Sequence, residues 1–80
     1  MARLKNEAYM KAFSNQLRKI RLSKKITLES LGQKSHLDLA TIHRIEKTHG
    51  NITLSTLLAL AKGLDVHPNK LLSFSHKEFL

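Results

Sequence analysis

Apolar residues recur along this chain at the spacing of an α-helix. Phe13, Leu17 and Ile20 lie at i, i+4 and i+7, which predicts one buried stripe on a helix over about residues 7–24. A second stripe predicts a helix that begins after Thr53 and contains Leu54, Leu57, Leu58, Ala61 and Leu64. No segment alternates apolar and polar residues as a strand would, so the expected fold is all-α.

Capping residues mark the limits of the other helices. Thr27 suits the N-cap of a helix over residues 28–35, and Asp38 suits the N-cap of a helix that runs to about residue 47. Pro68 fits the first position of a final short helix that ends near residue 72. Gly63 is expected to help end the helix before it. Five helices are therefore predicted.

The middle of the chain contains two short helices separated by a tight turn. Leu31 and Gly32 would let the second helix cross the first closely, and Leu37 would fill the turn. In the second helix Ile42 and Ile45 face the core, which leaves a short, polar and basic outward face of the kind that enters the major groove. This layout is a helix-turn-helix, and it predicts binding to double-stranded DNA.

Length and composition limit the alternatives. Eighty residues allow one small domain, with a core over residues 8–72 and terminal extensions at 1–6 and 73–80. The chain has no cysteine, which excludes disulfides and thiolate metal sites. It has neither an apolar run of roughly 20 residues that could cross a bilayer nor an apolar signal sequence, so a cytoplasmic protein is expected.

The net charge of +8 is concentrated in the first third of the chain. Residues 1–25 hold eight of the 14 Lys and Arg residues and one of the six acids, whereas residues 26–80 are nearly balanced. Such a basic surface attracts DNA phosphates without reading sequence. Charge alone leaves open the alternative of a solvated basic face.

Residues 13–72 resemble the phage repressor and Cro-like family of helix-turn-helix domains, which have the lambda-repressor-like fold. The resemblance rests on the LRKIR end of the first helix, on Leu31 and Gly32, on the IHRIE segment at residues 42–46, and on LSTLLALAKGLDV at residues 54–66. The chain is most similar to small single-domain regulators, including restriction–modification controller proteins and DNA-binding antitoxins. The resemblance implies a salt bridge between Arg21 and Glu46.

Two positions depart from the family pattern. Leu28 stands where the family commonly has a glutamine that holds a phosphate, so only backbone N–H groups remain for that contact. His36 stands where the family usually has a turn glycine, and a positive φ is expected there. A role for His36 as a pH sensor or a ligand is the alternative.

Base reading is assigned to the outward face of the second helix of the motif. Arg44 is the principal candidate because a guanidinium pairs bidentately with guanine, and a phosphate clamp is its alternative role. Ala40 and Leu39 could contact thymine methyl groups, although Leu39 could instead only cover the turn. His43 can donate or accept one hydrogen bond.

Phosphate contacts are expected on both sides of that helix. The expected residues are Arg18, Arg21 through its spare donors, Leu28 through its backbone, Thr41, Lys47, Thr48 and Asn51. These contacts would set the position of the protein on the duplex.

Neither a metal site nor a catalytic site is expected. The five histidines, His36, His43, His49, His67 and His76, form no convincing ligand pair on a helix face. There is no nucleophile elbow, no glycine-rich phosphate loop and no pair of acids suited to catalysis. The chain is therefore interpreted as a non-enzymatic protein without a cofactor.

A dimeric transcriptional regulator, a repressor or autoregulator, is the preferred interpretation, because one short helix reads too few base pairs to select one genomic site. The last two helices and the tail are expected to form the dimer interface. The candidate residues are Leu60, Phe74, Phe79 and Leu80, with the alternative that Leu60 packs inside.

The rival interpretation is a protein-interaction module of the same fold, such as an antitoxin that binds a toxin. Leu28 and Leu39 support it, because they are apolar where polar DNA contacts are expected. The basic first third of the chain argues against it.

Overall fold

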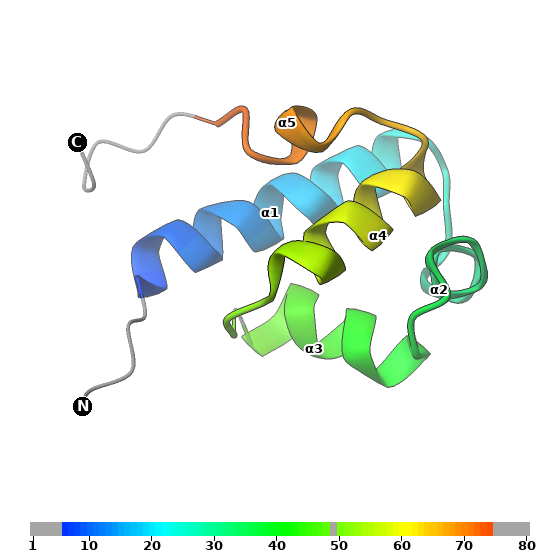
Figure 1. Ribbon diagram of the computed structural model, residues 1–80, viewed down its shortest axis with the longest axis horizontal. Coiled ribbons are helices and arrows are strands. Elements are labelled where there is room, and N and C mark those ends of the chain that lie inside the picture. The colour runs from blue at the N-terminus through cyan, green and yellow to red at the C-terminus, as the bar shows by residue number, and fades with distance from the viewer. Residues whose placement is uncertain (1–5, 49, 75–80) are drawn as a thin grey trace.

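Five helices make up the computed structural model, which describes residues 6–48 and 50–74 (Figure 1). They are α1 (Glu7–Ser23), α2 (Leu28–Ser35), α3 (Leu39–Thr48), α4 (Leu54–Leu64) and α5 (Pro68–Leu71). The helices α1 and α3 pack together, α2 packs on α3 and α4, and α5 packs on α1 and α4. The described residues contain no strand, so the all-α prediction with five helices is confirmed.

Short polar side chains begin three of these helices. The side-chain oxygens of Asn6, Thr27 and Thr53 accept hydrogen bonds from backbone N–H groups in the first turns of α1, α2 and α4, at 2.8, 3.0 and 3.1 Å. Helix α3 begins directly after Asp38, whose carbonyl oxygen accepts from the N–H of Ile42 at 3.1 Å. The caps satisfy N–H groups that a helix start leaves unpaired.

Three helices are followed by a residue other than glycine in left-handed backbone. His36 has φ 61°, as expected for the turn, and Lys25 and Asp65 have φ 58° and 57° after α1 and α4. Directly after Lys25 and Asp65, the next residue donates its N–H to a carbonyl five residues earlier, at 3.0 Å in both cases. This bond closes a Schellman turn and satisfies a carbonyl at the helix end.

The core is apolar and draws on all five helices. The buried apolar residues are Phe13, Leu17, Ile20, Leu31, Ile42, Ile45, Leu57, Leu60, Ala61, Leu64 and Leu71. Leu60 is fully buried, so its assignment to a dimer interface is wrong. Leu54 and Leu58, which the sequence places in the buried stripe, are 70% and 49% exposed. The leucine-rich segment allows two apolar stripes at helical spacing, one through Leu54 and Leu58 and one through Leu57, Leu60 and Leu64. Packing buries the second stripe.

A close crossing of α2 and α4 fixes this rotation of α4. A Cβ atom added to Gly63 would lie 2.9 Å from Leu31 Cδ1 and 3.0 Å from the Cβ of Ser35. Glycine is therefore needed because α2 approaches the backbone of α4. Gly63 lies in the last turn of α4, as expected, but α4 extends to Leu64 and the left-handed residue that caps it is Asp65.

Gly63→Ala is expected to destabilise the fold. The added methyl group would overpack the α2–α4 crossing at a cost of roughly 1–3 kcal/mol, and after a gain of about 1 kcal/mol in helix propensity the net cost is up to about 2 kcal/mol. Thermal denaturation of Gly50→Ala is the control, because a Cβ there meets only Thr48 Oγ1 at 3.8 Å. A melting temperature for Gly63→Ala at or above that of the wild type would contradict the close crossing.

The segment after α5 returns to the start of α1. The rings of Tyr9 and Phe74 lie 5.0 Å apart, tilted by 58°. Phe74 is half-buried by this packing within the chain. Phe79 and Leu80, which are predicted for the same interface, lie outside the described residues.

Candidate nucleic-acid interface

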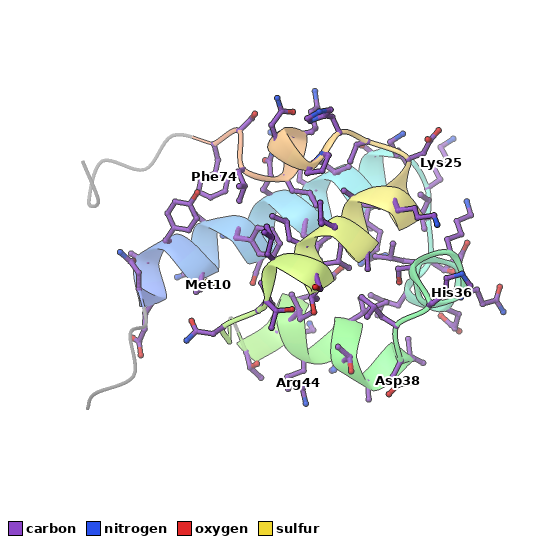
Figure 2. All side chains as sticks on the ribbon, in the orientation of Figure 1. Met10, Lys25, His36, Asp38, Arg44 and Phe74 are labelled. Atoms are coloured by element: carbon purple, nitrogen blue, oxygen red, sulfur yellow. The ribbon has the colours of Figure 1, made fainter. Side chains whose placement is uncertain are left out.

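The outward face of α3 carries the residues predicted to read bases. Leu39, Ala40, His43 and Arg44 are all exposed, while the two isoleucines of α3 are buried on its opposite face. Figure 2 shows Arg44 and Asp38 on the outer side of the molecule, away from α1 and α4. The exposed side chains are short or basic, so this face of α3 can enter a major groove.

A buried ion pair joins α3 to α1. Arg21 Nε donates to Glu46 Oε2 at 2.7 Å, and Arg21 Nη2 donates to Oε1 at 3.1 Å. Arg21 Nη1 donates to the carbonyl of Ile26 at 2.9 Å, and the Arg21 and Glu46 side chains are only 9% and 4% exposed. The Ser14 hydroxyl adds a second link, donating to the carbonyl of Ile45 at 2.7 Å.

The ion pair also shapes the charge of the interface. Glu46 is the only acid in α3, and the pair turns it inward, so the outward face carries Arg44 and Lys47 without a neighbouring carboxylate on the same helix. All three nitrogens of the Arg21 guanidinium are engaged within the chain. Little of Arg21 is open to a phosphate, and its geometry suits holding α3 in place.

An open hollow adjoins Arg44 between α3 and the start of α4. Thr41, Arg44 and Asn51 line it, and all three are residues that the sequence predicts to contact DNA. Thr56 of α4 also lines it, and sequence reasoning does not identify this residue, because its helix is assigned to the core and the dimer interface and not to DNA. With Thr53, the hollow is lined by a guanidinium, an amide and three hydroxyl groups, which suit the oxygens of a phosphate.

The other predicted phosphate contacts lie on α1, at the start of α2 and at the end of α3. Arg18, Lys47 and Thr48 are exposed, although the Thr48 hydroxyl already donates to the carbonyl of Arg44 at 2.7 Å. The Leu28 side chain packs against the core. Only backbone N–H groups are therefore left for a phosphate at the start of α2.

The described histidines lie at the surface of the molecule. His36, His43 and His67 are exposed, and the described residues contain no cluster of three potential metal ligands. His49 and His76 lie outside the described residues. Across residues 6–48 and 50–74, no helix has the length and apolar character needed to cross a membrane.

Residues 17–71 match a family model described as helix-turn-helix. The chain belongs to this family. Among solved structures, the restriction-modification controller protein C.AhdI from Aeromonas hydrophila is 32% identical, with 78% of this chain and 94% of that chain covered and a TM-score of 0.73. C.Esp1396I bound to a 25 base pair operator site is 36% identical, with 80% and 84% covered and a TM-score of 0.76. No curated protein matches the chain.

The family match confirms the interpretation drawn from residues 13–72. This helix-turn-helix protein is a sequence-specific DNA-binding transcriptional regulator and not an enzyme. The similar solved structures give no support to the antitoxin alternative.

Proposed function

We propose that this helix-turn-helix protein is a dimeric autoregulator of the controller type, which binds an operator upstream of its own gene in the cytoplasm. The observation that carries the proposal is the exposed basic face of α3 beside the hollow at Arg44. The similarity to C.AhdI, which extends over 94% of that chain, and the operator-bound structure of C.Esp1396I support it.

In this arrangement α3 lies in the major groove of the operator. Leu39, Ala40, His43 and Arg44 face the base edges. Phosphates are contacted by Arg18, the backbone at Leu28, Thr41, Lys47, Thr48 and Asn51, with Thr56 added from the geometry of the hollow. Arg21 acts mainly through its ion pair with Glu46.

An exposed apolar face replaces Leu60 as the proposed dimer contact. Leu54, Leu58 and Leu72 are 70%, 49% and 40% exposed. Leu54 and Leu72 line one apolar groove together with Tyr9 and Met10. Exposed apolar patches of this kind favour association, and a two-fold dimer would bury the same patch on both protomers.

Leu54→Glu/Leu58→Glu is expected to give a monomer at roughly tens of micromolar, because two like charges per protomer would be placed in the interface. Sedimentation measures the change. Both residues are exposed, so the melting temperature of the protomer should change little. Leu22→Glu is the control, since Leu22 is an equally exposed leucine on α1, at 53%. A wild-type monomer, or a variant that stays dimeric, would contradict this interface.

A gel-shift titration with the DNA upstream of the gene itself tests the proposed function. We expect binding to that duplex in preference to a scrambled duplex of equal length and composition, with affinity that falls as salt rises. No detectable DNA binding at low salt would contradict the proposal and would favour the protein-interaction module.

A further inference from the structure

A second group of basic side chains lies away from Arg44. Lys24, Lys34 and Lys62, at or near the ends of α1, α2 and α4, line one open hollow, here called the lysine hollow. Figure 1 shows the C-terminal ends of α1 and α4, where Lys24 and Lys62 lie, at the upper right of the molecule and α3 along its lower edge. The DNA contact proposed for α3 does not account for this cluster.

The positive charge of the lysine hollow is not neutralised within the described chain. The three lysines are exposed, and no described carboxylate lies within ion-pair distance of them. Asp65 is the one acid that lines the hollow. The carbonyl ends of three nearby helices each add a partial negative charge of about half a unit, which together with Asp65 lowers the positive charge of the three lysines without reversing its sign.

The composition of the lysine hollow favours phosphate groups over a protein surface. Lysine is depleted in protein interfaces, and their anchors are mostly aromatic residues or arginine, which do not line this hollow. The larger apolar residues beneath the lysines, Ile26 and Leu64, are half-buried and fully buried. Lysines bind phosphates as flexible point charges and need no shaped pocket.

We propose that the lysine hollow holds a second segment of duplex DNA, independent of its sequence, while α3 occupies the operator. The inference rests on the operator binding proposed above. Because the two surfaces lie on different sides of the molecule, one protein can contact two duplexes at once and bridge them.

The test compares two double variants with the same change in charge. Lys34→Gln/Lys62→Gln alters the lysine hollow, and the control Lys19→Gln/Lys70→Gln removes two exposed lysines elsewhere. Each protein first saturates a fluorescent duplex that carries the upstream operator. A second labelled duplex of random sequence is then added, and energy transfer between the two labels measures bridging. Operator affinity is measured separately on the first duplex alone.

Wild type and control are expected to bridge the duplexes. Lys34→Gln/Lys62→Gln should bind the second duplex roughly tenfold more weakly, and its slope of log affinity against log salt should be flatter by about two, one for each lost contact. Its operator affinity should equal that of the control. A failure of operator binding would appear in the separate affinity measurement and would identify a failure of the proposed function instead.

Three results would overturn the lysine hollow as a second DNA site. The first is an absence of bridging by wild type bound to its operator at low salt. The second is equal bridging by wild type and Lys34→Gln/Lys62→Gln. The third is a loss of affinity by that variant for a longer operator duplex with bridging unchanged, which would assign the lysines to DNA that flanks the operator.

Discussion

Replacement of Glu46 by alanine is expected to lower the free energy of unfolding by roughly 3–5 kcal/mol. The substitution removes the carboxylate from Arg21, whose side chain is only 9% exposed in the wild type, and only the carbonyl of Ile26 still accepts from the guanidinium. Small domains are stable by only about 5–15 kcal/mol in total. Thermal denaturation followed by circular dichroism should therefore show a much lower melting temperature.

Two variants separate the buried pair from a general effect of lost charge. Glu29→Ala removes an exposed acid in the first turn of α2 and should change stability by less than about 1 kcal/mol. Arg21→Met/Glu46→Leu replaces both charges with apolar groups and should recover most of the loss, because no buried charge is left unpaired. An unchanged melting temperature for Glu46→Ala would show that the pair is open to solvent.

The helices could be predicted from local sequence, but not all of their ends. Apolar spacing and the caps Thr27 and Thr53 are local signals, and the structure places both caps as expected. The left-handed residues Lys25 and Asp65 carry no such signal. Their conformation serves the apolar residues that follow them, Ile26 and Val66, which pack against the core. That requirement arises from tertiary packing and is not visible in the local sequence.

The rotation of α4 shows a second limit of sequence patterns. Leu58 and Leu60 each complete a stripe at helical spacing with their leucine neighbours, so periodicity does not select between them. The structure selects Leu60, because α2 approaches α4 at Gly63 and turns that side inward. The same crossing, which local sequence does not show, is the reason that residue 63 is glycine.

The candidate site likewise contains one feature that the sequence predicts and others that only the fold brings together. The exposure of Arg44 follows from its place opposite Ile42 and Ile45 on one helix, which the sequence alone shows. The position of Thr56 beside Arg44 depends on the path of the loop between α3 and α4. The lysine hollow is likewise invisible in the sequence, because its lysines come from three separate helices.

Arg44→Ala is expected to weaken operator binding by ~1–3 kcal/mol, which is about 5-fold to 150-fold. If the guanidinium pairs with a guanine, discrimination should relax at one base-pair position while binding to random DNA changes much less. Titrations with the operator, its single base-pair variants and a random duplex measure these effects. Arg18→Ala and Lys47→Ala are the comparisons, since loss of a phosphate contact should weaken binding to all sequences and flatten the salt slope by about one.

The hollow beside Arg44 makes a phosphate clamp the alternative role for this residue, because Thr41 and Thr56 line the same space. Arg44→Lys separates the two roles, since lysine keeps the charge but loses the bidentate geometry. A base reader should lose discrimination at one position in Arg44→Lys, whereas a phosphate clamp should keep both discrimination and most of its affinity. Equal losses for Arg44→Ala on operator and random DNA would assign Arg44 to the phosphate, and sequence reading would then fall to Leu39, Ala40 and His43.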